Sequence, residues 1–314
     1  MKDSPAARPA RTAVDSPYLV QTKERRTASN GSAYLDLTLL NNKGTVRAKL
    51  WDADRQHTDF EEEDVVRVIG EMEEYKGAPQ LIARKITRVL PGEINYAQLF
   101  PRSEREPDEM LAELLGRVRQ MAEGPLRALL LALLEDSAIA EKYKLAPAAM
   151  SYHHAYLGGL IEHVLSLIGA ADKICDHYGE LRRDLIVAGL ALHDIGKIEE
   201  LSYKTGLRYT TRGQLLGHIS IGAELVSEKV RAIPDFPASL RDQLLHIILS
   251  HHGELQFGSP KEPLFPEALV VHLLDNLDSK LQSMRTQYAA DKDRPGDFTA
   301  RNPALKRELF KMES

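Results

Sequence analysis

The stretch Leu190-Ala191-Leu192-His193-Asp194-Ile195-Gly196-Lys197 places a histidine and an aspartate side by side at the end of a nearly all-apolar segment. Burying an imidazole and a carboxylate together is costly unless both groups find partners. A divalent metal ion satisfies both groups at once. The stretch therefore predicts a metal site inside a helical domain, provided that the rest of the chain supplies further ligands.

The composition indicates a soluble globular protein with room for two domains. The chain has 314 residues, 43% of them hydrophobic, and no apolar run long enough to span a bilayer. It does not open with a signal segment, so we expect a cytoplasmic protein without a membrane partner. The single cysteine, Cys175, excludes an intramolecular disulfide framework and a cysteine-based zinc site. Any metal site must therefore use nitrogen and oxygen ligands.

Charge and histidine content differ along the chain. Residues 1–92 contain 15 lysines and arginines against 14 aspartates and glutamates, a balance of +1, whereas the remainder contains 26 against 32, a balance of −6. Ten of the eleven histidines lie between His153 and His272. An acidic, histidine-rich part is suited to concentrating divalent cations, so we expect catalysis there.

Local patterns divide the chain into five parts. Residues 1–16 are rich in Pro, Ala, Arg and Ser without apolar periodicity, which predicts a disordered tail. Residues 17–92 are expected to form a small β domain, 93–107 a linker, 108–288 a helical domain and 289–314 a polar C-terminal tail. The expected fold class is α+β with several domains: an N-terminal five-stranded β-barrel of the oligonucleotide-binding (OB) type, followed by an all-α domain.

Alternating apolar and polar residues predict the strands of the β domain. Five are expected, at residues 18–26, 34–39, 46–51, 65–72 and 80–90. If the leucines of the second strand face the barrel interior, the outer face of the same hairpin carries Tyr34, Arg47, Lys49 and Trp51. Cations suit phosphates and flat rings suit bases, so this face is predicted to bind single-stranded nucleic acid. The alternative, that alternation merely turns polar side chains to solvent, stays open.

Helical periodicity dominates the second half of the chain. Helices are expected at residues 108–123, 125–135, 156–178, 181–193, 218–232, 237–252 and 266–284, with a small hairpin at 201–211. Candidate metal ligands lie on inward faces or at ends of these helices. They are His163, His193, Asp194, His218, His251 and Asp275. His252 is an alternative ligand to His251. A lone histidine of this kind is usually a core residue, but so many together favour a metal centre.

The candidate ligands suffice for two ions. His163, His193, Asp194 and Asp275 can enclose one ion, and Asp194 can bridge to a second. That second ion would be held by His218 and His251. Two ions about 4 Å apart can activate water and polarise a phosphoryl group. Nitrogen and oxygen ligands suit Mn, Co, Fe, Ni or Zn, and manganese is favoured.

Lys197 lies one turn after Asp194 and could neutralise a phosphate oxygen, so both residues are predicted to be catalytic. The alternative for Lys197 is a solvated lysine at a helix end.

These residues carry a family resemblance. His163, His193-Asp194 and Asp275 are similar to the HD-domain phosphohydrolase superfamily, and His218 with Ser250-His251-His252-Gly253 resembles its two-metal branch. Three longer stretches resemble the YhaM-type 3'-5' exoribonucleases, in which an OB barrel precedes the HD domain. These stretches are His153-His154-Ala155-Tyr156-Leu157-Gly158-Gly159-Leu160-Ile161-Glu162-His163, Asp275-Asn276-Leu277-Asp278-Ser279-Lys280, and Asn30-Gly31-Ser32-Ala33-Tyr34-Leu35 through Lys49-Leu50-Trp51-Asp52.

The resemblance implies metal-dependent hydrolysis of single-stranded RNA, and also of single-stranded DNA, from the 3' end to nucleoside 5'-monophosphates. It further implies that His252, His153 and His154 are candidates for binding metal or substrate. Whether the chain forms a homo-oligomer is left open. Two alternatives also remain: a phosphohydrolase of a small nucleotide or cyclic dinucleotide, and a non-catalytic single-strand-binding protein with a structural metal.

Overall fold

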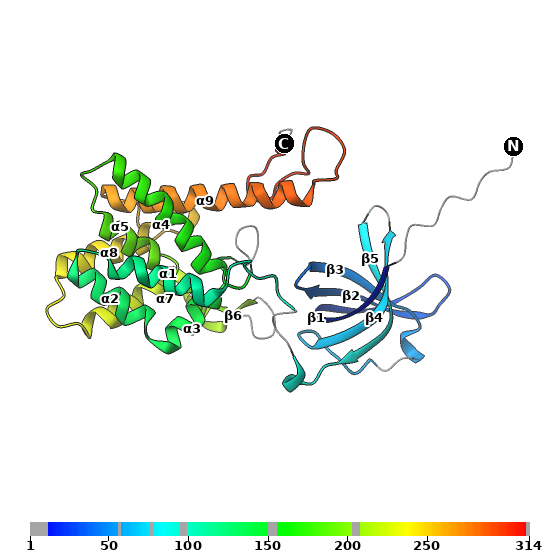
Figure 1. The fold of residues 1–314 in the computed structure, drawn as a ribbon. Helices are drawn as coiled ribbons and strands as arrows, with labels where there is room; N and C mark the ends of the chain where they lie inside the picture. The colour runs from blue at the N-terminus through cyan, green and yellow to red at the C-terminus, as the bar shows by residue number, and fades with distance from the viewer. Residues whose placement is uncertain are drawn as a thin grey trace. The chain divides into compact units, whose positions relative to one another are not determined.

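The computed structural model describes residues 12–55, 58–75, 78–94, 99–149, 156–202 and 208–311. The chain divides into two compact units, and the boundary between Arg102 and Ser103 lies within the segment 93–107 (Figure 1). The first unit is a β-barrel and the second is helical. None of the described helices is long and apolar enough to cross a membrane.

The barrel consists of five strands closed in the order β1-β2-β3-β5-β4. Their bounds are β1 (Thr12–Thr27), β2 (Ala33–Asn41), β3 (Gly44–Leu50), β4 (Val65–Tyr75) and β5 (Ala78–Arg88). Strands β3 and β5 are parallel, whereas the other neighbouring strands are antiparallel. This is the five-stranded arrangement of an OB fold, so the predicted barrel is confirmed.

The β2–β3 hairpin shows how the alternating sequence builds the barrel core. Leu35, Leu37 and Leu39 are buried, and they lie opposite Leu50, Ala48 and Val46 on the neighbouring strand. The turn between the strands needs Gly44, whose φ of +114° disfavours a side chain. The leucines therefore point inward, as predicted, and their neighbours along the strand point outward.

The first strand corrects one prediction. Residues 12–16, assigned to a disordered tail, belong to β1 and pair with β4, from Thr12 opposite Met72 to Ser16 opposite Val68. Most of these side chains are at least partly exposed, so hydrophobic burial leaves no signal in the sequence. Backbone pairing to β4 forms this part of the strand, and such pairing is invisible in local patterns.

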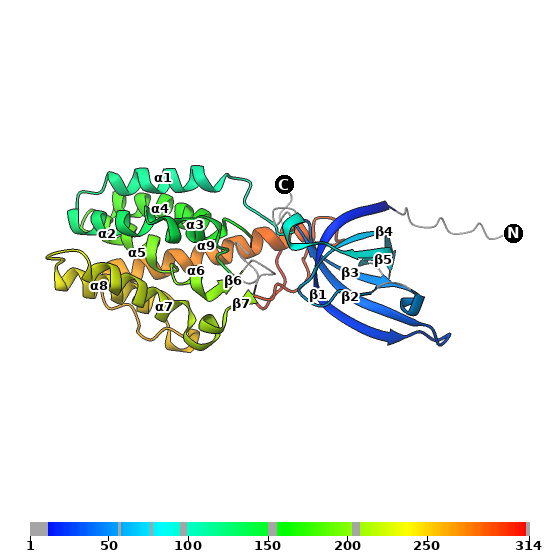
Figure 2. The same ribbon diagram turned by 90° about the horizontal axis from the view of Figure 1, so that it is seen from below.

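The helical unit is built around one almost completely buried helix, α5 (Arg183–Leu192). Every residue from Leu185 to Leu192 is buried, which is expected of a helix that is apolar on all sides. Helices α4 (Gly159–His177), α8 (Ala238–Ser250) and α9 (Pro266–Ala290) pack against it (Figure 2). The remaining helices are α1 (Pro107–Arg119), α2 (Gly124–Leu134), α3 (Ser137–Leu145), α6 (Lys197–Glu200) and α7 (Thr211–Arg231).

The small hairpin was predicted, but the two short helices α3 and α6 were not. Strands β6 (Leu201–Ser202) and β7 (Arg208–Tyr209) pair antiparallel within the predicted hairpin. Helix α3 had a readable signal, because the carboxylate of Asp136 accepts hydrogen bonds from the backbone of Ala138 and Ile139 at its start. Helix α6 has four residues, too few for a hydrophobic period to appear.

The C-terminal segment also differs from its prediction. Residues 289–314 were interpreted as a polar tail, yet α9 continues to Ala290 and residues 291–311 fold into a compact structure with two isolated bridges, Phe298 to Phe310 and Asn302 to Arg307. Thr299, Asn302 and Leu309 are buried there. We call residues 291–311 the C-terminal cap.

Candidate metal centre

The helical unit brings all six predicted metal ligands into one cluster. His163 comes from α4, His218 from α7 and Asp275 from α9. His193 and Asp194 follow the last residue of α5, and His251 follows α8. His163, His193, Asp194 and His251 are buried, so the cluster lies inside the bundle. Two groups have ligand atoms within 4.8 Å of one another: His163, His193 and Asp194, and His218, His251 and His252.

Asp194 stands between these two groups, and each of its oxygens faces a different one. Its Oδ2 atom lies 3.3 Å from Nε2 of His193. Its Oδ1 atom lies 3.4 Å from Nε2 of His218 and 3.6 Å from Nε2 of His251. One carboxylate is thus positioned to serve both halves of the cluster.

Asp275 completes the first half. Its Oδ1 atom lies 3.1 Å from Nε2 of His163 and 3.9 Å from Nε2 of His193. Together with Oδ2 of Asp194, two histidine nitrogens and two carboxylate oxygens converge here. This donor set suits a borderline divalent ion.

In each of four histidines, Nδ1 forms a hydrogen bond that orients the ring so that Nε2 points into the cluster. The Nδ1–H donors and their acceptors are His163 to Oδ2 of Asp278 (2.8 Å), His193 to the carbonyl of Leu190 (2.8 Å), His218 to Oε1 of Glu200 (3.1 Å) and His251 to the carbonyl of Ile248 (2.7 Å). A carbonyl oxygen can only accept, so Nδ1 carries the proton in His193 and His251. Their Nε2 lone pairs are then available to a metal ion.

Four buried atoms of the cluster test whether a metal fits. Nε2 of His193, His218 and His251, and Oδ1 of Asp194, have no hydrogen-bond partner among the residues that the structure describes. A buried acceptor without a partner costs about 1–3 kcal/mol. All four point into the same small region, where a cation would satisfy them together. The residues therefore fit a divalent metal centre.

Electrostatics keeps Asp194 and His251 in metal-binding forms. Burial alone would raise the pKa of Asp194, but the charge of Lys197 and the contact with His193 hold that pKa well below its usual range. Burial lowers the pKa of His251, so this imidazole stays neutral. Burial opposes protonation of His163 as well, but its bonds to Asp275 and Asp278 raise its pKa to about 9. A proton on Nε2 of His163 and a metal ion would compete for the same space between this nitrogen and Asp275.

Lys197 is not a solvated residue at a helix end. Its side chain is only 12% exposed, and its ammonium group donates to Oδ2 of Asp194 at 2.6 Å and to the carbonyl of Ala148 at 2.5 Å. The alternative interpretation is therefore wrong. Contact of this ammonium with a phosphate oxygen stays a prediction.

Two carboxylates of the centre were not predicted as site residues. Glu200 is buried and accepts hydrogen bonds from the backbone N–H of His218 (2.8 Å) and from its ring. Burial would raise its pKa, but the bonds with His218 lower it. Asp278 fixes His163, and its position three residues after Asp275 on α9 could have revealed it, because residues three apart share a helix face.

Two glycines shape the centre around His218. Helix α7 is interrupted at Gly217, whose φ of +70° breaks the helix and lets a new helical segment begin at His218, as predicted. Gly196 packs directly on this turn: a Cβ atom at Gly196 would lie 2.0 Å from the backbone oxygen of His218. The glycine of the opening stretch therefore permits the close approach that brings His218 to Asp194.

His252 lies at the edge of the centre. Its ring centroid is 5.3 Å from that of His218 and 4.4 Å from that of His251, and its Nδ1–H donates to the carbonyl of Phe257 at 2.9 Å. It is less buried than His251, which lies next to Asp194. The other two candidates, His153 and His154, lie outside the described residues.

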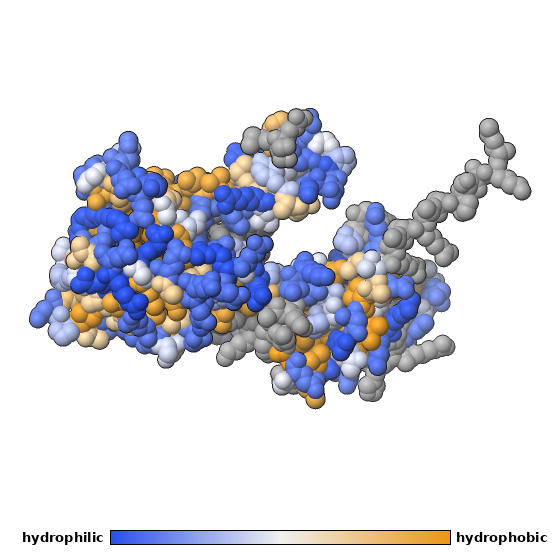
Figure 3. Space-filling model, in the orientation of Figure 1, coloured by the Kyte–Doolittle hydropathy of each residue, from blue (hydrophilic) through white to orange (hydrophobic). Residues whose placement is uncertain are grey.

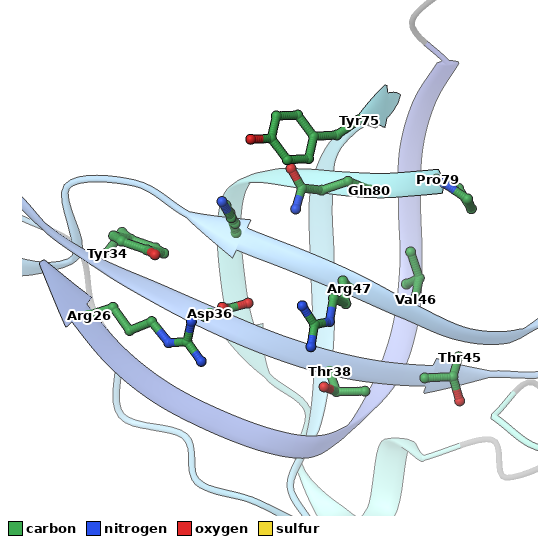
Figure 4. A pocket seen from close by; sticks show the side chains of 11 residues that line it. Arg26, Tyr34, Asp36, Thr38, Thr45, Val46, Arg47, Tyr75, Pro79 and Gln80 are labelled. Atoms are coloured by element: carbon green, nitrogen blue, oxygen red, sulfur yellow. Dashed lines mark ion pairs between the residues drawn. The ribbon is translucent and has the colours of Figure 1, made fainter. Parts of the chain in front are cut away.

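Tyr34, Arg47 and Lys49 of the predicted face line a groove of about 810 Å³ on the barrel, together with Arg26, Asp36 and Tyr75, whereas Trp51 does not line it (Figure 4). The rings of Tyr34 and Trp51 lie 4.8 Å apart. The ammonium group of Lys49 lies 5.3–5.6 Å from the ring centroids of Tyr34, Trp51 and Tyr75. Tyr75, from β4, was not predicted because it belongs to a different hairpin.

Comparison with known proteins agrees with both units. Residues 160–280 match the HD domain family, and residues 19–89 match the family described as OB-fold nucleic acid binding domain. The HD match indicates dependence on a divalent metal, and the OB-fold match indicates binding of single-stranded nucleic acid.

Relatives cover almost the whole chain. The 3'-5' exoribonuclease YhaM of Bacillus velezensis is 36% identical over 303 residues, which are 95% of this chain and 94% of that protein. YhaM of Bacillus subtilis is 35% identical over 301 residues, with the same coverage. YhaM of Listeria welshimeri is 35% identical, covering 93% of this chain and 92% of that protein. The chain belongs to the YhaM family of 3'-5' exoribonucleases.

Proposed function

We propose that this chain is a divalent-metal-dependent 3'-5' exonuclease that releases nucleoside 5'-monophosphates from single-stranded RNA and also acts on single-stranded DNA. The observation that carries the proposal is the position of Asp194, whose two oxygens face two different groups of histidines. Membership of the YhaM family and the groove on the barrel support it.

Within this proposal, His163, His193, Asp194 and Asp275 would hold one ion, and Asp194, His218 and His251 would hold a second. Bound divalent ions acidify water and neutralise charge on a phosphoryl group. The protein's contribution is to fix the ligand nitrogens through their outer hydrogen bonds and to keep the carboxylates ionised. Lys197 keeps Asp194 in place and adds positive charge beside the phosphodiester. Manganese is the favoured ion.

On the barrel, Tyr34 and Trp51 stack bases, and Arg47 and Lys49 neutralise phosphates of the same strand. The aromatic rings hold the Lys49 ammonium group by cation–π attraction, so the groove is organised before the nucleic acid binds. A cytoplasmic location and assembly into a homo-oligomer remain predictions.

A 5'-labelled single strand tests the reaction directly. With manganese, the purified protein should convert it into a ladder shortened from the 3' end, and a chelator should stop the reaction until metal is restored. A circular single strand, which has no 3' end, should stay intact. If the linear strand also stays intact while only small or cyclic nucleotides are cleaved, the chain is a small-nucleotide phosphohydrolase. Cleavage of the circle would indicate an endonuclease.

The neighbouring histidines after α8 should differ in importance. Replacing His251 with alanine should lower kcat by at least about 100-fold, because its buried Nε2 faces Oδ1 of Asp194 and would be lost as a ligand. His252→Ala should cost less, since this side chain lies at the edge. The measurement is the initial rate on the labelled strand.

The exposed His177 at the end of α4 is a matched control for these variants, and His177→Ala should behave as the wild type. A larger loss for His252→Ala than for His251→Ala would show that the assignment of the ligand is reversed.

A further inference from the structure

The C-terminal cap is a built structure, although the sequence shows no period there. The side-chain amide of Asn302 bonds Ser283 of α9, and its oxygen accepts from the backbone of Leu305 at 2.8 Å. The hydroxyl of Thr299 accepts from the backbone of Leu309 at 3.0 Å. Asn302 therefore ties the cap to α9, and Thr299 joins the two ends of the cap, which follows the C-terminal end of α9 (Figure 1).

Asp291 is one of four carboxylates in the cap, and it is used internally. It accepts hydrogen bonds from the backbone of Ala300 and, at 3.0 Å, from the side-chain amide of Gln287. The bond from Ala300 lowers the pKa of Asp291, so the group stays ionised. Its charge anchors the loop through these bonds and also attracts Arg294 and Lys311, without forming a salt bridge with either.

Six cations of the cap form no salt bridge with any carboxylate that the structure describes. They are Lys292, Arg294, Arg301, Lys306, Arg307 and Lys311. Six cations against four carboxylates give the cap a net charge of +2, in a chain whose net charge is −5. Many arginines elsewhere are paired, such as Arg67 with Asp15 and Arg183 with Asp172. Although the charge of Asp291 attracts Arg294 and Lys311, the cap keeps a small excess of positive charge.

Two exposed phenylalanines lie in the same segment as these cations. Phe298 is 51% exposed and Phe310 57% exposed, with ring centroids 5.7 Å apart at an angle of 63°. The bridge between their backbones and the hydrogen bond from the hydroxyl of Tyr288 to the carbonyl of Phe310 (3.1 Å) fix their positions. On the face that Figure 3 shows, hydrophilic residues make up much of the surface around the C-terminal end of α9. Half-exposed flat rings in a segment with an excess of cations suit stacked bases and their phosphates.

We propose that the C-terminal cap is a second binding surface for single-stranded nucleic acid, in which Phe298 and Phe310 stack bases and Arg301 and Arg307 contact phosphates. The cap lies outside both matched domains, which cover residues 19–89 and 160–280. The choice of ligand rests on the proposed exonuclease function. The proposal that the cap is a binding surface rests on its excess of positive charge and on the exposure of Phe298 and Phe310.

Binding of the full-length, metal-loaded protein to a fluorescent oligouridine tests the proposal. The strand should be about 20 nucleotides long, to span more than one binding surface, and its 3'-terminal linkages should be phosphorothioates that resist hydrolysis. Phe298→Ala with Phe310→Ala should weaken binding at least about fivefold, because stacking on each ring is lost. Arg301→Ala with Arg307→Ala should flatten the dependence of log Kd on log salt by about 0.7 per lost phosphate contact.

Matched variants separate stacking from structure. Phe310→Tyr should keep the affinity, because its ring still stacks, whereas Phe310→Leu keeps apolar bulk and should lose affinity. Tyr178, a 52% exposed aromatic residue, and Lys173, an exposed lysine, both on or beside α4, supply controls whose alanine variants should bind as the wild type.

The same variants distinguish failure of this proposal from failure of the exonuclease function. Hydrolysis of bis(p-nitrophenyl) phosphate, which carries no bases, should be unchanged in every cap variant. A protein that binds the strand through the cap but cleaves nothing would contradict only the exonuclease. Unchanged Kd and salt dependence in the cap variants would overturn the cap proposal. Unchanged binding with an altered mass by light scattering would also overturn it, and would mark the cap as a protein interface.

Discussion

Asp194→Asn should lower kcat/KM on a labelled single strand by at least about 1,000-fold, since metal-ion stabilisation of several kcal/mol is lost and each 1.4 kcal/mol is a factor of ten. The amide keeps the shape of the side chain but loses its charge, and only one of its two atoms can still accept. The ion near His193 and Asp275, or the ion near His218 and His251, would therefore lose Asp194 as a ligand. Bound metal, measured by elemental analysis, should fall with activity.

Asp172→Asn is the matched control for this substitution. Asp172 is a partly buried carboxylate on α4 that pairs with Arg117 and Arg183 instead of lying among the histidines. Its loss should lower stability while leaving metal content and kcat close to wild type. If Asp194→Asn retained its metal and a tenth of the activity, the carboxylate would not be the shared ligand of the centre.

Gly196→Ala should destabilise the helical unit by about 3 kcal/mol or more, at the upper end of the cost of overpacking. The added Cβ would lie 2.0 Å from the backbone oxygen of His218 and 2.7 Å from the backbone nitrogen of Gly222. Neither backbone atom can rotate away, so α6 and α7 must separate and His218 must leave Asp194. Urea unfolding should show a lower midpoint, and strand hydrolysis should fall in parallel.

Gly169→Ala provides the control for that variant. Gly169 lies inside α4, and a Cβ atom there would meet nothing within 4 Å. Because alanine favours a helix over glycine, this variant should be as stable as the wild type or more stable by up to about 1 kcal/mol. A Gly196→Ala protein that unfolds at the wild-type urea concentration would show that α6 and α7 can shift without cost.

The barrel could be predicted from alternating residues, but not its full extent. The β2–β3 hairpin was readable because three leucines share one face and a glycine turn follows. The first half of β1 was not, because its side chains are exposed and only its pairing with β4 makes it a strand. The parallel contact of β3 with β5 joins distant segments, which local patterns do not specify.

The metal ligands could be predicted because histidines and aspartates on apolar faces are unusual. Their supporting residues could not. Glu200 follows Glu199 in the sequence, and such a pair is typical of a solvated helix; only the contact with His218 distinguishes Glu200. The cap was missed for a related reason: Asn302 and Thr299 hold it through side-chain hydrogen bonds, which leave no hydrophobic period.

Closure of the barrel has a further consequence, for aggregation. A sheet with a free edge offers unpaired backbone groups to any extended chain, and proteins must protect such edges. Among the described residues, β1 pairs first with β4 and then with β2, so one long strand serves two neighbours and each of the five strands has partners on both sides. Only short unpaired stretches remain, such as the two halves of β1, each of which has one neighbour. The barrel can therefore recognise extended, flexible chains through its side chains while offering little template for β-sheet growth.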